Sequence, residues 1–299
     1  MNKPYDAVCF GEILWDVLPS GAKPGGAPMN VAYHLQKMGL QAALISRIGT
    51  DQRGEELLSI LHQNGLSTDY VQKDAVQPTG IVNATIHESN EVTYEIVHHV
   101  AWDFIALEKR LTELVSNAQF FIYGCLAARD QHTAQTLWQL TEAAQTRVVD
   151  INLRPPHYSK ELVERLFKSA AILKLNENEL PLITSWYSTL HNDEEQVRFL
   201  QDRFSIPTII VTKGGDGAMV CEEGKIVSHP GYKVTVADTV GSGDAFLAAF
   251  LSKTKQGTGL QERLEFANAM GAFIASKQGA CPAYGVADIT AMTGQTFST

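Results

Sequence analysis

Short apolar runs alternate with longer amphipathic runs along most of the chain. The apolar runs, typical of strands buried on both faces, are Ala7–Phe10, Ala43–Ile48, Phe120–Tyr123, Val148–Ile151, Ala171–Leu175 and Thr208–Thr212. The amphipathic runs, which predict helices, are Pro28–Met38, Gly54–Gln63, Leu107–Val115, Thr133–Ala143 and Glu194–Phe204. This alternation predicts an α/β fold with a mostly parallel sheet and helices on both faces.

The segment 79–99 breaks this alternation, because it has no helical period. Residues 80–87 and 92–98 predict two strands around a turn at Glu88–Glu91. Together with Ile13–Leu18 they predict a small separate sheet. No linker rich in Pro, Gly or Ser divides the chain, so we expect one domain that carries a small β-lid. The expected α/β domain comprises 1–10, 28–78 and 101–299, and the expected lid comprises 11–27 and 79–100.

Composition narrows the class of protein. The 299 residues are 44% hydrophobic and 19% charged, as in ordinary globular proteins, and the net charge of −9 argues against a nucleic-acid partner. No apolar stretch approaches the roughly 18 residues that a membrane span needs, and Met1–Gly11 lacks the layout of a signal peptide. The four cysteines are scattered without a C-x-x-C pair, so we expect neither zinc nor disulfides, and a cytoplasmic location.

The histidines are not expected to form a metal site. His98 and His99 are adjacent, and adjacent side chains in a strand point to opposite faces.

The stretch Asp238–Phe246, Asp-Thr-Val-Gly-Ser-Gly-Asp-Ala-Phe, carries the strongest chemical signal. It joins a β-rich run at Tyr232–Val236 to an apolar helical run at Ala245–Leu251. A helix that begins near Gly243 would direct its free N–H groups at an anion, most often phosphate. Asp244 adds a carboxylate there, and a phosphate cradle beside a base is what phosphoryl transfer to a hydroxyl requires. The alternative is a tight turn whose carboxylate only stabilises the helix N-terminus.

Two other nucleotide-binding patterns are absent. The chain has no G-x-x-x-x-G-K-[ST], and the pattern G-x-G-x-x-G fails at Phe246.

Two motifs far apart in the chain carry a family resemblance. Asp238–Phe246 resembles the C-terminal signature of the ribokinase-like (PfkB) carbohydrate kinases, and Gly25–Ala32 resembles their N-terminal signature. Arg47–Asp51 and Gly54 follow in the order that the family shows. The resemblance covers essentially the whole chain, and Gly-Gly-Ala-Pro-x-Asn is most similar to the bacterial fructokinase branch.

The resemblance implies roles for residues of both signatures. Asp244 would be the catalytic base, and the N–H groups of Gly241, Ser242 and Gly243 would hold the charge that develops on the phosphoryl group. The sugar hydroxyls would be bound by Asp16, Gly25, Gly26, Asn30 and Asp244. An ordinary loop with a solvated Asp and a surface Asn is the alternative.

The resemblance also implies cofactor positions. Asn176 and Glu179 would position Mg²⁺ through water, although an acidic helix start is the simpler interpretation. Lys213, Gly214 and Gly217 would lie beside ATP, or form only a hairpin turn. Asn268 would line the adenine pocket, or merely pack. Asp238 and 277–280 would hold K⁺. Roles for three further residues stay open, namely Trp102, Asp103 and Arg154.

The expected activity is ATP-dependent phosphorylation of a sugar, most favourably D-fructose to fructose 6-phosphate. The alternatives are 2-keto-3-deoxygluconate or another furanose-forming sugar. Ribose is less favoured, because Ala27-Pro28 stands where ribokinases have Lys-Gly. A regulator that binds sugar or nucleotide without turnover is an alternative of another class, against which the intact Asp244 argues. The resemblance also suggests a homodimer in which two lids clasp.

Overall fold

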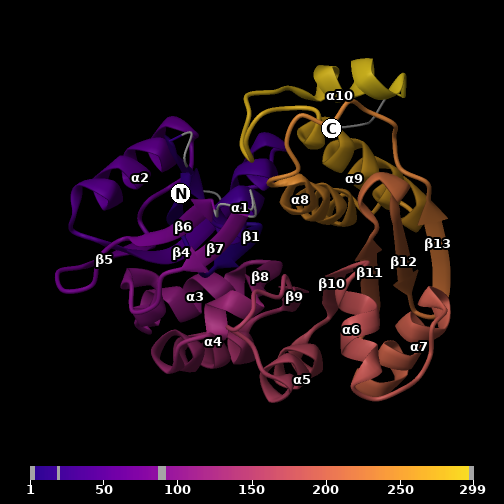
Figure 1. The fold of residues 1–299 in the computed structure, drawn as a ribbon, viewed down its shortest axis with the longest axis horizontal. Coiled ribbons are helices and arrows are strands. Elements are labelled where there is room, and N and C mark those ends of the chain that lie inside the picture. Colours follow the sequence, from indigo (N-terminus) through magenta and orange to yellow (C-terminus); the bar gives the residue numbers. More distant parts are fainter. Residues whose placement is uncertain (1–3, 19–20, 87–91, 296–299) are drawn as a thin grey trace.

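A nine-stranded sheet forms the centre of the protein in the computed structural model, which describes residues 4–18, 21–86 and 92–295. Its strand order is β13-β12-β11-β10-β9-β8-β1-β4-β5 (Figure 1). The strands are β1 (Ala7–Phe10), β4 (Ala42–Gly49), β5 (Val71–Asp74), β8 (Phe120–Gly124), β9 (Thr146–Asp150), β10 (Ile172–Asn176), β11 (Thr208–Thr212), β12 (Ala218–Glu222) and β13 (Lys225–His229).

The predicted fold class is confirmed. Neighbouring strands from β5 to β11 run parallel, and each of the six predicted strands forms close to its expected bounds. The sheet ends in an antiparallel edge, β11-β12-β13, that the sequence analysis did not predict. In a mostly parallel sheet the carboxyl ends of the strands share one edge, which is where ligands bind in open α/β folds.

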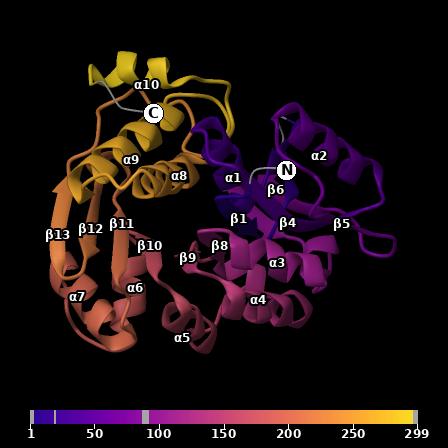
Figure 2. The ribbon, with the colours of Figure 1, turned by 180° about the vertical axis from the view of Figure 1, so that it is seen from behind.

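Helices cover both faces of the sheet (Figures 1 and 2). One layer consists of α1 (Ala27–Lys37), α2 (Gln52–Gln63), α8 (Ser242–Lys255), α9 (Leu260–Ala275) and α10 (Val286–Thr293). The other layer consists of α3 (Lys109–Asn117), α4 (Gln131–Ala143), α5 (Lys160–Ser169), α6 (Glu179–Ser185) and α7 (Asp193–Phe204). Each layer buries its apolar stripe in a separate hydrophobic core against the sheet.

Side chains in the turns start several of these helices. Asp51 accepts a hydrogen bond from the Gly54 N–H at α2, and Ser159 accepts one from Leu162 at α5. Such caps satisfy backbone donors that the first helical turn leaves free, each with roughly 1 kcal/mol of stabilisation.

A small four-stranded sheet stands apart from the large one. Its order is β3-β2-β6-β7, formed by Gly21–Gly25, Leu14–Leu18, Gly80–Ile86 and Val92–Ile96. Strands β2 and β6 pair parallel, while β3 and β7 add antiparallel edges. The turn expected at Glu88–Glu91 lies outside the described residues. The division of the chain into a domain and a lid stays a prediction.

Two local expectations were wrong. Tyr232–Val236 is not a strand, because Pro230 and the left-handed Gly231 (φ 78°) turn the chain away from the sheet after β13. His98 and His99 do not continue β7, which ends at Ile96, and His99 has a left-handed φ of 60°. Their rings therefore stack on one side, with centroids 4.3 Å apart, instead of facing opposite ways.

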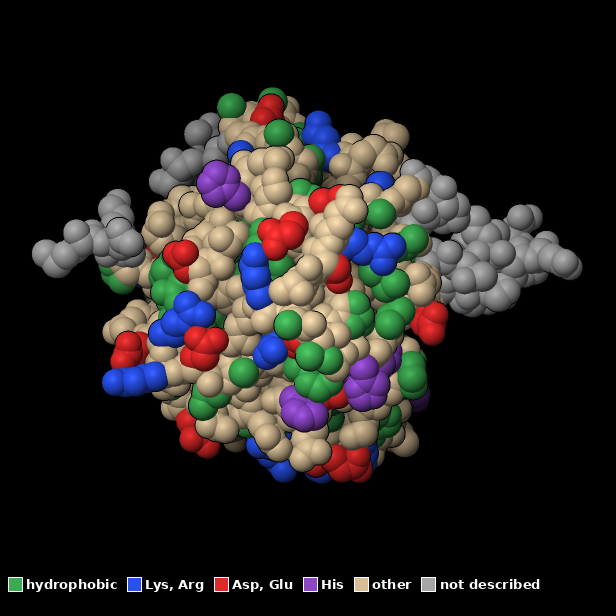
Figure 3. All heavy atoms as spheres, turned by 90° about the vertical axis from the view of Figure 1, so that its left-hand side faces the viewer, with side chains coloured by type: hydrophobic (Ala, Val, Ile, Leu, Met, Phe, Trp, Pro, Cys, Tyr) green, Lys and Arg blue, Asp and Glu red, His purple; other side chains and the backbone are tan. Residues whose placement is uncertain are grey.

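The surface is mixed in charge. On the face in Figure 3, acidic and basic side chains are interspersed. Within the described ranges, every helix is too short or too polar to cross a lipid bilayer.

A buried ion pair anchors the small sheet to the large one. The Arg129 guanidinium binds the Asp103 carboxylate through two hydrogen bonds of 2.7 and 2.8 Å. It also donates to the Val97 carbonyl at 2.6 Å, just after β7, and stacks over the Trp102 ring at 3.8 Å. Both charged side chains are at most 1% exposed. Trp102 and Asp103 are thus buried parts of this junction.

Substitution of Asp103 by Ala should lower the free energy of unfolding by about 3–5 kcal/mol, because it leaves a buried guanidinium without its counter-charge. Glu113→Ala is the control, since the Lys109–Glu113 pair is 91% and 64% exposed and should contribute less than about 1 kcal/mol. Urea titration of the three proteins measures both effects. Equal losses in the two variants would contradict the anchor.

Candidate active site

The site is built around the N-terminus of α8. This helix begins at Ser242, close to the predicted start, and Gly241 precedes it in a left-handed conformation with φ 78°. A Cβ at Gly241 would lie 2.6 Å from the Cβ of Ala280, so only glycine fits. No described side chain caps this turn, although the Ser242 N–H donates to the Thr239 carbonyl at 3.3 Å. The first turn gives this end of the helix a partial positive charge. The start of α8 is therefore suited to bind an anion, and we call it the anion cradle.

Asp244 lies in the first turn of α8, buried against α1. Its Oδ2 accepts a 2.8 Å hydrogen bond from Asn30 Nδ2, and Asn30 Oδ1 accepts one from the Cys281 thiol at 3.4 Å. Burial, followed by the charge of Asp150, raises the pKa of the Asp244 carboxyl to about 6, against the lowering effect of Asn30, Lys174 and Arg154. A carboxylate with such a pKa is suited to accept a proton near neutral pH.

A lysine lies beneath the cradle. Lys174 Nζ forms a 2.7 Å ion pair with Asp150 Oδ2, and both residues are buried. Burial opposes the charged form, but Asp150, Asp244 and Glu179 together raise the pKa of Lys174 above its ordinary value. A Cβ at Gly243 would lie 3.4 Å from this ammonium, so the cation adjoins the start of α8. Lys174 could not be identified from the sequence, because it is a single charged residue in a buried strand.

Asp16, Gly25 and Gly26 meet where the small sheet joins α1. A Cβ at Gly25 would lie 2.3 Å from Asp16 Oδ2, and one at Gly26 would lie 2.5 Å from the Glu12 carbonyl oxygen. Both glycines therefore permit close approach of the backbone. Burial raises the pKa of the Asp16 carboxyl, and the charge of Arg154 opposes that rise.

Glu12 is a second carboxyl that the sequence analysis missed. It is 5% exposed, and its Oε1 accepts a 3.1 Å hydrogen bond from the Ala27 N–H at the start of α1. Burial raises the pKa of Glu12 to about 7, with a further contribution from Asp244. The signal that could have identified it is a polar residue between apolar ones directly after β1.

Arg154 lies in the loop after β9, close enough to affect this group of carboxyls. Its charge opposes the effect of burial on the pKa values of Glu12, Asp16 and Asp244. Among the described residues it forms no ion pair, and its Nη1 donates only to the Leu153 carbonyl at 3.1 Å. This arrangement leaves an exposed guanidinium available to an anionic or hydroxyl-bearing ligand.

Asn176 and Glu179 lie together after β10. Asn176 Oδ1 accepts from the N–H groups of Asn178 and Glu179, each at 2.9 Å. The buried Glu179 carboxylate accepts from Leu153 N–H at 2.7 Å and Asn176 N–H at 2.9 Å. These bonds fix both side chains, and the lone pairs left on their oxygens suit Mg²⁺ held through water rather than directly.

Asp238 and the segment 277–280 come together, as expected. Asp238 Oδ2 accepts a 3.1 Å hydrogen bond from the Gly279 N–H, and Gln278 Nε2 donates to the Ala237 carbonyl at 3.2 Å. Since Ala280 packs on Gly241, this double loop borders the start of α8.

The remaining predicted residues are engaged in local structure. Lys213 Nζ forms a 2.6 Å ion pair with Asp193, and Gly214 and Gly217 shape the β11–β12 connection with positive φ values. Asn268 donates to the Leu264 carbonyl in its own helix at 2.8 Å. Each contact agrees with the simpler structural interpretation, so the nucleotide roles of these residues stay predictions.

A large open cavity lies elsewhere. It has a volume of about 550 Å³ and is lined by residues that include Arg47, Asp74, Phe104, His132 and Gln139. None of the residues described above lines it, so the candidate site rests on the chemistry around Asp244.

The chain is similar in sequence to known carbohydrate kinases. The family model for pfkB family carbohydrate kinases matches residues 20–284. "Probable fructokinase-5" of Arabidopsis thaliana is 30% identical, covering 92% of this chain and 93% of that protein. "Fructokinase-2" of Oryza sativa subsp. japonica is 28% identical, covering 94% and 91%.

Solved structures share the fold. A fructokinase with bound ATP from Xylella fastidiosa superposes with a TM-score of 0.85 at 20% identity, covering 97% of this chain and 98% of that one. A fructokinase from Vibrio cholerae with fructose, ADP and calcium superposes with a TM-score of 0.82 at 23% identity, covering 96% and 98%.

The raised pKa of Asp244 predicts how stability depends on pH. The pKa of Asp244 is about 6 in the folded protein and 3.8 in the unfolded chain. Protonated Asp244 therefore contributes its full stabilisation below pH 3.8, and this contribution is lost as the pH rises through about 6. Asp244→Asn removes this loss, so at pH 7 the variant should match or exceed the wild type by about 1–3 kcal/mol, with little difference near pH 4.

Urea titrations at the two pH values measure this effect. Asp202→Asn is the control, because Asp202 is exposed and should shift stability equally at both. A variant of Asp244 that unfolds more easily at pH 7 would show that the carboxylate mainly stabilises the helix N-terminus.

Proposed function

Since the chain belongs to the pfkB family of carbohydrate kinases, we propose that it transfers the γ-phosphate of ATP to the 6-hydroxyl of D-fructose. The observation that carries the proposal is Asp244, a buried carboxyl with a pKa of about 6 at the start of a helix that no described side chain caps. Base and anion cradle lie within one turn, which is what phosphoryl transfer to a hydroxyl requires.

In this mechanism Asp244 accepts the proton of the attacking sugar hydroxyl. The N–H groups of Gly241 and Gly243 would stabilise the charge that develops on the phosphoryl oxygens, and that of Ser242 would do so in place of its 3.3 Å hydrogen bond to the Thr239 carbonyl. Lys174 lies below Gly243 and adds a positive charge whose position is fixed by Asp150. Asn30 orients the carboxylate of Asp244 through its 2.8 Å hydrogen bond.

The sugar would lie between the small sheet and α1. Asp16 accepts hydroxyl protons, while Gly25 and Gly26 allow close approach of the backbone. Arg154 contributes a cation on the same side. The variant Gly-Gly-Ala-Pro-x-Asn and the fructokinase names of the relatives favour fructose over other acceptors.

The cofactor assignments are part of the proposal. Asn176 and Glu179 would hold Mg²⁺ through water, and bound Mg²⁺ would neutralise phosphate charge. Lys213, Gly214, Gly217 and Asn268 would border the nucleotide. Asp238 and the loop 277–280 would hold K⁺ and so fix the carbonyls behind the cradle.

The assembly and location are proposals as well. Strand β7 is an edge strand of the small sheet, and its Tyr94 is 65% exposed. An edge strand has unpaired backbone N–H and C=O groups that can pair with a strand of another chain. We propose that two such sheets clasp in a homodimer. A cytoplasmic location fits the four unpaired cysteines.

Asp244→Asn tests the catalytic role. The side chain keeps its size and its hydrogen bond to Asn30 but cannot accept the sugar proton, so kcat should fall by about 10²–10⁴-fold. The affinity for ATP should change little, because backbone N–H groups form the cradle. Steady-state rates and ATP titration of one preparation measure both. Retention of more than about a tenth of wild-type kcat would exclude Asp244 as the base.

A panel of acceptors tests the substrate. With ATP and Mg²⁺, fructose should give the highest kcat/KM among fructose, ribose, adenosine and 2-keto-3-deoxygluconate in an ADP-release assay. A preference of about tenfold or more for another acceptor, roughly 1.4 kcal/mol in transition-state binding, would reject fructose and leave the fold assignment intact. Nucleotide binding without ADP release for any acceptor would instead favour a regulator.

A further inference from the structure

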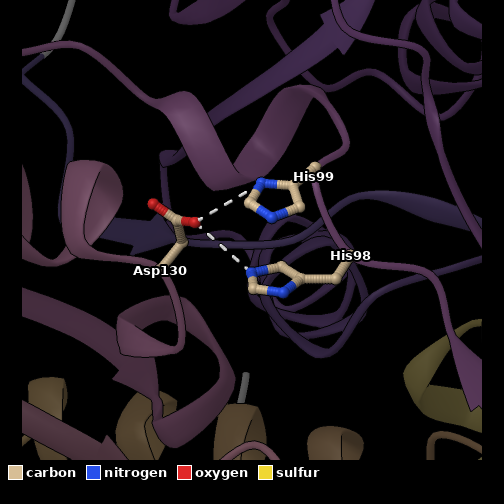
Figure 4. A group of neighbouring side chains, drawn as sticks. All are labelled: His98, His99 and Asp130. Atoms are coloured by element: carbon tan, nitrogen blue, oxygen red, sulfur yellow. Dashed lines mark ion pairs between the residues drawn. The ribbon is translucent and has the colours of Figure 1, made fainter.

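Three metal-ligating side chains converge at the junction between the small sheet and α4. His98 and His99 follow β7, and Asp130 is the N-cap residue of α4. Asp130 Oδ2 lies 3.3 Å from His98 Nε2 and 4.0 Å from His99 Nδ1 (Figure 4). All three ligand atoms lie within 4.8 Å of one another.

The backbone at His99 creates this convergence. Its φ of 60° is left-handed, which is uncommon for a residue other than glycine. The two imidazole rings consequently stack at an interplanar angle of 14° instead of pointing to opposite faces. Figure 4 shows both rings directed toward the same oxygen of Asp130.

Asp130 is held in place before any ion arrives. Its Oδ1 accepts from the His132 N–H at 2.9 Å and lies 2.9 Å from His132 Nδ1. The oxygen that faces His98 and His99 therefore belongs to a fixed carboxylate, as outer hydrogen bonds commonly arrange around metals.

We propose that His98, His99 and Asp130 bind one divalent transition-metal ion, with Zn²⁺ as the best fit. Bonds of about 2.0–2.2 Å in a tetrahedral site separate the ligand atoms by about 3.3 Å. The observed 3.3 and 4.0 Å require only small rotations of exposed side chains. Two nitrogens and one oxygen suit Zn²⁺ rather than Mg²⁺ or Ca²⁺, which prefer oxygen ligands.

The site is open to ions from solution. The His98 and His99 side chains are 40% and 68% exposed, and a water molecule can occupy the fourth position. The proposed zinc site uses neither Asn176 nor Glu179, so it is separate from the expected Mg²⁺ position. A bound ion would cross-link the end of β7 to α4 and thereby stabilise the junction that the Arg129–Asp103 pair already forms.

Zinc titration of the full chain tests the proposal by calorimetry, with the melting temperature as a second readout. Wild type should bind one Zn²⁺ and melt at a higher temperature with the ion than after chelation. The double variant His98→Gln/His99→Gln should bind about tenfold or more weakly and lose the zinc-dependent shift. Asp130→Asn, which keeps the helix cap, should behave in the same way.

His191→Gln is the matched control, because His191 is exposed and outside the cluster. It should bind zinc as the wild type does. The cysteines compete little, since three are buried and one is half-buried. Melting of each variant without metal confirms that it is folded. The proposal is overturned if the wild type binds no Zn²⁺, or if the double variant binds it as tightly as the wild type.

Discussion

The free-energy cost of burying the Asp244 carboxylate is the constraint that organises the centre of this protein. An ionised carboxylate loses its hydration when it is buried, and without partners it would stay protonated at neutral pH. Asn30 donates a hydrogen bond to it, and the charges of Lys174 and Arg154 offset part of the cost. These partners hold the pKa near 6, which leaves the group mostly ionised at pH 7 and able to accept a proton.

Burying the Lys174 ammonium also costs free energy, because a buried charge loses its hydration. A buried ammonium also needs a counter-charge, and Asp150 on the neighbouring strand provides it at 2.7 Å. The parallel pairing of β9 with β10 sets Asp150 directly beside Lys174 in register. The parallel sheet thus places Asp150 and Lys174, which come from separate parts of the chain, side by side at the edge where α8 begins. The surroundings of Asp244 therefore depend on strand register as much as on its own sequence motif.

Contiguous features of the site could be predicted from the sequence, and dispersed ones could not. Gly241, Gly243 and Asp244 stand together, and their order alone indicates a helix start with a carboxylate. Lys174 and Glu12 are single polar residues beside apolar strands, so only the packed sheet shows which charges they meet.

The expected orientation of His98 and His99 was wrong for a local reason. The prediction assumed that His98 and His99 continue a strand, and no sequence pattern indicates that His99 adopts a left-handed backbone. Most strands and helices were predictable because buried strands and amphipathic helices differ in period. The antiparallel edge β12-β13 was missed because its short strands lack a distinct pattern.

The loop 277–281 contacts both the start of α8 and α1. Ala280 fills the space that a side chain at Gly241 would need, and its carbonyl lies 2.9 Å from His34 Nε2. Burial lowers the pKa of His34 to about 4, so the ring is neutral at physiological pH. A carbonyl can only accept, so Nε2 carries the proton and Nδ1 accepts from the Tyr284 hydroxyl at 2.9 Å. One tautomer thereby links α1, the loop and the start of α8, and a shift in any of these would move the N–H groups at the start of α8.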